Sequence, residues 1–234
     1  MFETEIRDGV FQARSPGGRW LLTGWSGGYT DADAVYNVSV PEGWDRTDLA
    51  AYTTERREAA GFDTPGRSLL TGVDMKHAVG AELDGVRVVA TVGLSNPAHL
   101  PLEPDGTVPA GLVPEESPET GTVNLLVGTE RALADGALAT LLGVAVEAKT
   151  ATLQGLTGFS GTTSDAVAVG TDPDGVKAAF AGSATVVGDA TRAAVREAVR
   201  GSFESRFATE APPTSVDSAD AGIVTSRMAE VFDP

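Results

Sequence analysis

Polar residues interrupt the most apolar stretch of the chain at Glu147, Lys149 and Gln154. If this stretch is helical, successive side chains are about 100° apart, so Lys149 lies about 200° round the helix from Glu147. Glu147 follows the apolar run 141–146, which predicts partial burial, and a partly buried carboxylate is suited to act as a general base. The same position also suits a structural glutamate that pairs with an arginine. Lys149 can stabilise negative charge on a reacting oxygen.

A second group of reactive side chains occupies residues 160–165. Four hydroxyl side chains surround Gly161 there: Ser160, Thr162, Thr163 and Ser164. Such a turn can cradle a polar ligand or supply a Ser or Thr nucleophile, and Asp165 can act as a base. A turn that merely caps itself has the same composition.

Three asparagines lie at or inside strand-like segments, namely Asn37, Asn96 and Asn124. Asn96 follows the apolar run 88–94, at a strand end where binding loops are common. Asn124 alternates with apolar neighbours, so its side chain points to the opposite face of its strand. Each amide can bind a substrate amide or stabilise an oxyanion, or it can be a satisfied polar group of the core or of a turn. His99 is the better histidine for function, because it borders a proline-rich segment.

The apolar patterns predict the elements that must position these groups. Strands are expected at 20–24, 35–40, 68–73, 86–93, 122–127, 165–169 and 179–187. Helices are expected at 47–60, 131–153, 190–203 and 219–232, with Gly155 ending the second and Asp189 capping the third. We therefore expect one domain over residues 1–234, of the α/β or α+β class. It has a mixed sheet flanked by helices, and the long helix near 131–154 packs on that sheet.

Residues 96–120 form a long segment with six prolines. A connection of this length is either disordered or a lid over a site, and we expect a lid. The Pro-containing connection at 210–221 is expected to be a mobile surface loop.

The composition excludes several classes of protein. Cysteine is absent and only His77 and His99 are present, so we find no convincing set of metal ligands and predict no cofactor. The formal charge of −16 disfavours nucleic-acid and membrane-surface partners. No apolar run approaches the roughly 18 residues needed to cross a bilayer, and the acidic start lacks a signal-peptide pattern. We expect a cytoplasmic protein, and its acid-rich, lysine-poor composition resembles that of halophilic proteins. The sequence leaves open whether it forms homo-oligomers.

Several blocks of the chain together resemble the adenosylcobinamide amidohydrolase family. They include Gly121-Thr122-Val123-Asn124, Glu147-Ala148-Lys149-Thr150-Ala151 and Ser164-Asp165-Ala166, with weaker blocks around Asn37 and Asn96. Thr163 stands where the pattern leads us to expect glycine. The resemblance implies hydrolysis of the amide that joins the aminopropanol arm to the corrin ring. The products would be adenosylcobyric acid and (R)-1-amino-2-propanol, in corrinoid salvage for coenzyme B12 synthesis, and an archaeal source is in keeping with it.

For this reaction we assign candidate roles as hypotheses. Catalytic candidates are Glu147, Asp165, Lys149 and Asn124, and candidates for contact with the corrinoid substrate are Asn37, Asn96, His99, Thr122, Thr162 and Ser164. The attacking group is either a water activated by a carboxylate or a Ser or Thr hydroxyl. Two alternatives remain open, a corrinoid carrier without turnover and an amidase with another substrate.

Overall fold

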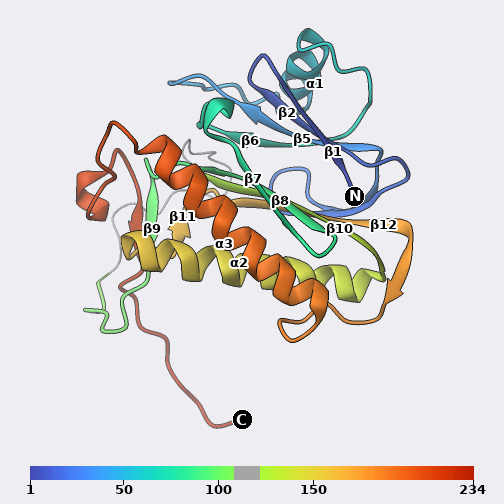
Figure 1. Cartoon of the computed structure of the whole chain (residues 1–234). Coiled ribbons are helices and arrows are strands. Elements are labelled where there is room, and N and C mark those ends of the chain that lie inside the picture. Colours follow the sequence, from blue (N-terminus) through green and yellow to red (C-terminus); the bar gives the residue numbers. More distant parts are fainter. Residues whose placement is uncertain (108–121) are drawn as a thin grey trace.

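The computed structural model describes residues 1–107 and 122–234. Its two larger sheets lie face to face, with helices covering both outer faces (Figure 1). Sheet A has the strand order β1-β2-β5-β6, and its strands are β1 (Glu3–Arg7), β2 (Val10–Arg14), β5 (Ala34–Ser39) and β6 (Arg67–Thr71). Helix α1 (Leu49–Ala59) covers its outer face.

Sheet B has the order β4-β3-β12-β10-β8-β7. Its strands are β3 (Arg19–Leu22), β4 (Gly28–Asp31), β7 (Val79–Leu83), β8 (Val86–Val92), β10 (Val123–Leu133) and β12 (Ala166–Ala178). Helices α2 (Asp135–Thr157) and α3 (Val186–Arg206) pack on the face of sheet B that points away from sheet A. In Figure 1 the layers therefore run from α1 through sheets A and B to α2 and α3.

The parallel strand pairs of sheets A and B both belong to β-α-β units. Strands β5 and β6 pair in parallel and α1 connects them, and β10 and β12 pair in parallel and α2 connects them. A parallel pair requires a crossover of this kind, because the chain must return to the same end of the sheet. The remaining neighbours in sheets A and B are antiparallel.

Side-chain alternation along the strands separates the layers. On β10, Val123, Leu125 and Val127 pack against the helices, whereas Leu126 faces sheet A. On β5, Val35 faces sheet B, while Tyr36 and its apolar neighbours pack against α1. These apolar faces form the three hydrophobic layers that hold the four layers of elements together.

A third, small sheet lies at one end of sheet B. It has the order β11-β9-β13 and consists of β9 (Pro97–His99), β11 (Gly161–Thr162) and β13 (Ile223–Val224). Two 3-10 helices complete the described elements, η1 (Met75–His77) and η2 (Val216–Ser218). After β13 the chain leaves the body as an extended tail (Figure 1).

The expected fold class is confirmed as α+β, with mixed sheets and the long helix packed on sheet B. The first six predicted strands are also confirmed, at β3, β5, β6, β8, β10 and β12. Helix α2 meets the length and composition criteria for a membrane span, although we expected no apolar run long enough to cross a bilayer. It packs on sheet B and α3 and buries Lys149, which is the arrangement of a core helix.

Two predicted elements are wrong. Residues 179–187 do not form a strand, because they turn into α3, where the Thr185 hydroxyl accepts a hydrogen bond from the backbone N–H of Gly188. Residues 219–232 do not form a helix. Their backbone is extended and pairs with β9, and Met228, Val231 and Phe232 are exposed, so a helix there would have no surface on which to bury an apolar face.

The helix ends also differ from expectation. Strand β10 continues to Leu133, so α2 starts later than predicted, and it ends at Gly158 in the left-handed conformation instead of at Gly155. Helix α3 is capped by Thr185 and not by Asp189, which lies in its first turn. Within the expected lid at 96–120, residues 97–99 form β9, and 108–120 lie outside the described residues.

Candidate functional site

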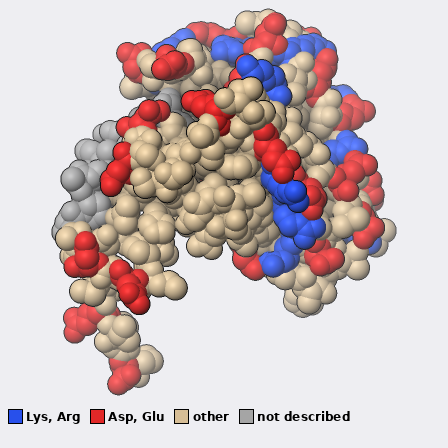
Figure 2. Space-filling model, turned by 60° about the vertical axis from the view of Figure 1, so that its left-hand side comes forward, with Lys and Arg blue, Asp and Glu red and all other residues tan. Residues whose placement is uncertain are grey.

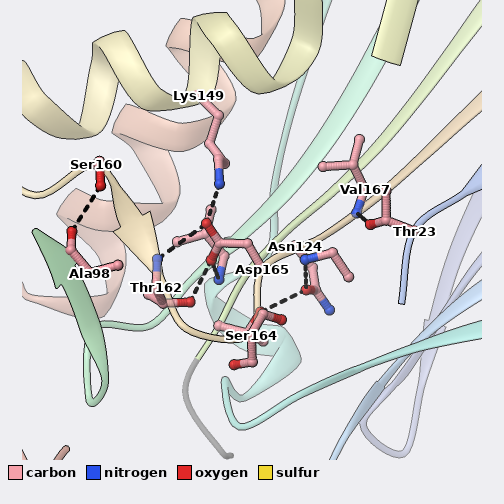
Figure 3. Close-up of polar contacts among 12 residues, drawn as sticks. Thr23, Ala98, Asn124, Lys149, Ser160, Thr162, Ser164, Asp165 and Val167 are labelled. Atoms are coloured by element: carbon pink, nitrogen blue, oxygen red, sulfur yellow. Dashed lines mark hydrogen bonds and ion pairs between the residues drawn. The ribbon is translucent and has the colours of Figure 1, made fainter. Parts of the chain in front are cut away.

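The predicted polar groups converge at one edge of sheet B. Strands β10 and β12 are parallel, so both begin at this edge, and β8 ends there because it runs antiparallel to β10. The backbone N–H of Gly93, just after β8, donates to the carbonyl of Thr122, just before β10 (3.1 Å). The turn 161–165 precedes β12 at the same edge, and Lys149 reaches it from α2 (Figure 3).

Asp165 fastens this turn to the sheet. Its Oδ1 accepts hydrogen bonds from the backbone N–H of Val123 (2.9 Å) and from the Thr162 hydroxyl (2.5 Å). Its Oδ2 accepts from the backbone N–H of Thr162 (3.2 Å) and forms an ion pair with Lys149 Nζ. The side chains of Lys149 and Asp165 are only 6% and 13% exposed. A carboxylate has about four lone-pair positions, so these four donors occupy Asp165 and make it an anchor for the turn.

Asn96 holds the hydroxyl groups of the same turn. Its Nδ2 donates to Thr163 Oγ1 (2.6 Å) and lies 3.2 Å from Ser164 Oγ. Its backbone carbonyl accepts from the backbone N–H of Thr163 (3.1 Å). The Asn96 side chain is fully buried, and its Oδ1 has no hydrogen-bond partner. Buried polar atoms are rarely left unpaired, so this oxygen is a ready acceptor at the site.

Asn37 and Asn124 meet between the two large sheets. Asn124 Nδ2 donates to Asn37 Oδ1 (2.8 Å) and to the carbonyl of Leu70 (2.8 Å), and Asn37 Nδ2 donates to Thr91 Oγ1 (3.1 Å). Asn124 Oδ1 accepts from the backbone N–H of Ala166 (3.2 Å). The expected orientation of Asn124 is thus confirmed. Both amides are buried and their polar atoms are engaged, so they tie sheet A to sheet B behind the site.

Thr122 connects the hydrogen-bonded pair Asn37 and Asn124 to the turn 161–165. Its hydroxyl lies within hydrogen-bond distance of Asn124 Oδ1 (2.9 Å) and of the Ser164 carbonyl oxygen (2.8 Å). The structure therefore brings Asn37, Asn96, Thr122, Asn124 and the turn 161–165 into one connected group around Lys149.

Glu147 is not part of this group. It lies on the opposite face of α2 from Lys149 and forms an ion pair with Arg192 of α3. Its side chain is 59% exposed, so the expected partial burial is wrong. The cause is that α3 covers α2 only partly. The neighbouring apolar residues of α2 face the core, whereas Glu147 lies on the exposed part of the helix. The open alternative of a glutamate paired with an arginine describes its position.

His99 also lies apart from the turn 161–165. Its Nδ1 is 3.3 Å from the carbonyl of Gly158, and the imidazole lines a separate pocket of about 300 Å3. Thr157, Phe159 and Val224 line the same pocket. His99 shares strand β9 with the residues that follow Asn96 but contacts the end of α2.

A larger cleft, of about 660 Å3, opens at the edge that carries the turn 161–165. Its lining includes the residues after β5, β6 and β8 and the chain from Arg206 to Asp220. Ser95 lines the cleft and is followed directly by Asn96. The sequence interpretation treated 210–221 as a mobile loop and missed this cleft. A signal that could have pointed to it is the pair of glycines, Gly72 and Gly93, which directly follow the observed strands β6 and β8.

No three His, Cys, Asp or Glu side chains cluster as metal ligands within residues 1–107 and 122–234. The carboxylate of the turn, Asp165, is already bound to Lys149 and Thr162. The prediction that the protein carries no cofactor remains a prediction.

Comparison with known proteins identifies the family. A family model described as adenosylcobinamide amidohydrolase matches residues 2–211. The curated adenosylcobinamide amidohydrolase of Halobacterium salinarum is 52% identical over 239 aligned positions, which cover the whole of both chains. A crystal structure of the PH0078 protein from Pyrococcus horikoshii OT3 overlaps 86% of this chain and 78% of its own, with 12% identity and a TM-score of 0.44. On the strength of the family match and of the full-length halophilic relative, this chain belongs to the adenosylcobinamide amidohydrolase family.

Proposed function

We propose that this protein hydrolyses the amide that joins the aminopropanol arm of adenosylcobinamide to the corrin ring. The products are adenosylcobyric acid and (R)-1-amino-2-propanol. Membership of the family supports the substrate and the reaction. The structural observation that carries the proposal is the turn 161–165, anchored by Asp165 and Asn96 at a sheet edge that opens into a cleft of about 660 Å3. Ligand sites commonly lie in such a position.

The hydroxyls held by Asn96 are the groups we assign to the scissile amide. Ser160 donates to the carbonyl of Ala98 (3.0 Å) and Thr162 donates to Asp165. Thr163 and Ser164 accept hydrogen bonds from Asn96 Nδ2, which places both hydroxyl groups at this sheet edge. A hydroxyl group that donates to the substrate carbonyl stabilises the oxyanion that forms when the amide is attacked.

The roles of Asp165 and Lys149 follow from their contacts. With four donors around its carboxylate, Asp165 positions the turn, and Lys149 balances its charge below the site. The attacking group is either the Ser164 hydroxyl or a water that enters beside it. Glu147 takes no part, because it projects from the other face of α2.

The test is turnover of adenosylcobinamide at high salt, with adenosylcobyric acid and aminopropanol measured by mass spectrometry. We expect the wild-type protein to form both products and Ser164→Ala to lower kcat by about 100-fold or more, as loss of an oxyanion donor or nucleophile does. Glu147→Gln is the matched control and should retain the wild-type rate. Corrinoid binding without any product would overturn the proposal and show a carrier.

The same turnover assay separates the two attacking groups. If Ser164 is the nucleophile, the intact mass of the protein should increase by the corrinoid acyl group during turnover, and hydroxylamine should trap that acyl group. If water attacks directly, no such adduct should form, although Ser164→Ala is still slow.

We also propose that the protein works in the cytoplasm and needs no resident cofactor. Amide hydrolysis requires an attacking group, proton transfer and oxyanion stabilisation, and side chains can supply all three. The cobalt belongs to the substrate. Activity that survives exhaustive dialysis against a chelator would support this, and activity restored only by added metal would contradict it.

A further inference from the structure

The cleft of about 660 Å3 has one wall that lies beyond the residues matched by the family model. That match ends at residue 211, and the residues that line the cleft beyond it are Pro212, Pro213, Thr214, Ser218, Ala219 and Asp220. The alignment with the Halobacterium salinarum relative spans the whole chain and includes this segment. We call residues 210–220 the C-terminal wall.

Backbone hydrogen bonds hold the C-terminal wall in place. Just after it, the N–H of Ala221 donates to the carbonyl of Ser95 (2.9 Å), and β13 then pairs in parallel with β9. Gly222 has φ of +138°, and a Cβ there would lie 2.6 Å from the carbonyl oxygen of Pro97. Only glycine fits this approach, so the wall is attached at a defined place beside β9.

Strand β9 also connects the cleft to the reacting turn. On its other side β9 pairs with β11, with Ala98 opposite Gly161 and Pro97 opposite Thr162. Asn96, immediately before β9, donates to Thr163. Ser95 lines the cleft, and Asn96, the next residue, donates to Thr163, so two consecutive residues connect the cleft to the turn.

The lining of the cleft combines apolar and charged groups. Val73 and Leu94 line the cleft but are each only 3% exposed, whereas Pro212 and Pro213 are half-buried and supply accessible apolar surface. Glu42 follows β5 and Asp220 belongs to the C-terminal wall, and neither forms an ion pair with any described residue. Arg206 pairs with Glu210, and both line the cleft. The site thus offers two unpaired acceptors, one guanidinium donor and apolar contacts between them.

The lining of the cleft does not suit a flat aromatic nucleobase. Among the described residues of the lining, Phe207 is the one aromatic ring. Phe203 lies against that ring at a centroid distance of 5.0 Å, and the Arg206 guanidinium lies 5.1 Å from its centroid. The ring is therefore engaged by its own neighbours instead of being presented as a stacking surface.

We propose that this cleft binds the edge of the corrin ring, where methyl groups alternate with primary carboxamide side chains. Glu42 and Asp220 accept the carboxamide N–H groups, Arg206 donates to a carboxamide oxygen, and the half-buried Pro212 and Pro213 contact the methyl groups. The C-terminal wall thereby selects a corrinoid over a simpler amide. The inference rests on the proposed function and deepens it, because it names the part of the substrate that is read apart from the scissile bond.

The first test fills the cleft. Ala219→Trp places a large side chain in the C-terminal wall, and Ala139→Trp on the exposed face of α2 is the matched control. The dissociation constant of adenosylcobinamide is measured from the change in corrinoid absorbance. We expect the dissociation constant to rise at least about tenfold for Ala219→Trp and to change no more than about twofold for the control. Equal affinity for both variants would overturn the inference.

The second test uses charge and leaves the shape of the cleft intact. Its probe is cobinamide in which peripheral carboxamides have been hydrolysed to carboxylates. Wild-type protein should bind this probe about tenfold more weakly than cobinamide, because Glu42 and Asp220 repel it. The double variant Glu42→Gln/Asp220→Asn should reduce that ratio to about twofold. Both positions are exposed, so folding is not at risk. An unchanged ratio would contradict the assignment.

The outcomes separate this inference from the proposed function. If the wild-type protein turns over adenosylcobinamide but neither variant alters binding or KM, the function stands and the cleft assignment fails. If corrinoid binds without hydrolysis and both variants weaken or relax binding as expected, the assignment stands and the proposed hydrolysis fails. If no corrinoid binds, both fail.

Discussion

The Lys149–Asp165 pair places two opposite charges in the interior beside the reacting turn. Burial of charges is costly, and their attraction offsets that cost only when the geometry is good and the remaining polar atoms are satisfied. Here the backbone N–H groups of Val123 and Thr162 complete the shell of the carboxylate. The pair therefore connects α2, the turn and the start of β10 through a single carboxylate.

Replacement of Lys149 by methionine should leave the Asp165 carboxylate buried without its counter-charge. We expect the free energy of unfolding to fall by about 3–5 kcal/mol, measured by urea denaturation at high salt. Lys177→Met is the control, since Lys177 is exposed and forms no ion pair with the described residues, and it should change stability by less than about 0.5 kcal/mol. A loss below about 1 kcal/mol for Lys149→Met would show that the pair does not hold the turn.

At the scale of elements, close packing explains why one glycine is required by its surroundings and another is not. A Cβ on Gly170 of β12 would lie 2.5 Å from ring atoms of Trp20 on β3, whereas a Cβ on Gly143 of α2 would meet nothing within 4 Å. Gly170 therefore serves the contact between the strand and the aromatic ring. Gly143 lies on the exposed face of α2, where glycine is simply a poor helix former.

These two positions predict opposite effects of the same substitution. Gly170→Ala should destabilise the protein by about 1–3 kcal/mol, because Trp20 must move in a packed core. Gly143→Ala should stabilise it by up to about 1 kcal/mol through helix propensity. Thermal unfolding of both variants under one buffer condition measures the difference. Equal shifts in Tm would contradict the packing assigned to Trp20.

The 3-10 helix η1 is joined to α3 by a histidine. His77 Nδ1 lies 3.0 Å from Ser205 Oγ, and the backbone carbonyl of His77 accepts a hydrogen bond from Ser202. Burial is the main cause that lowers the pKa of His77 below 6.5, and the positive charges of Lys76 and Arg206 lower the pKa further, against the opposing effect of Asp74.

This lowered pKa predicts a stability that decreases in acid. Because the folded-state pKa is below 6.5, the unfolded chain binds the proton first as the pH falls, so folding stability decreases from about pH 6.5 downward until the folded protein is protonated too. Tm measured from pH 7.5 to pH 5 should fall less steeply for His77→Gln than for wild type. Parallel curves would show that His77 does not contribute.

At the scale of the whole molecule, charge distinguishes this protein. It carries a formal charge of −16, and acidic groups outnumber basic ones over much of the face seen in Figure 2, around a broad uncharged area. Repulsion between like charges destabilises the compact state. Salt screens this repulsion, and the screening length falls from about 10 Å at 0.1 M to about 3 Å at 1 M.

Stability should therefore rise with salt. We expect Tm to increase steadily as KCl is raised from about 0.1 M to about 2 M, because screening weakens self-repulsion between exposed acids. A parallel series with sucrose controls for stabilisation by solutes that are merely excluded from the surface. A Tm that falls with KCl would contradict the halophilic interpretation.

Apolar periodicity is a local property, and it predicted about half of the described elements from the sequence but did not find β1, β2, β4 or β7. It located β3, β5, β6, β8, β10 and β12 and the cores of α1, α2 and α3, and the blocks around Asn124, Lys149 and Asp165 indicated the family. It failed at 179–187 and 219–232, where a turn and a long-range strand pairing outweigh local composition.

The composition of the site required the tertiary structure. Glu147 and Lys149 are two positions apart, yet one faces solvent beside Arg192 and the other lies buried against Asp165, and only the placement of α3 and the turn decides which. Asn37 and Asn124 are far apart in the chain and meet because two sheets stack face to face. The sequence by itself determined the three α-helices, the six strands named above, the family and the charge. The cleft and the shared carboxylate of Asp165 arise from contacts between distant segments, which no local pattern encodes.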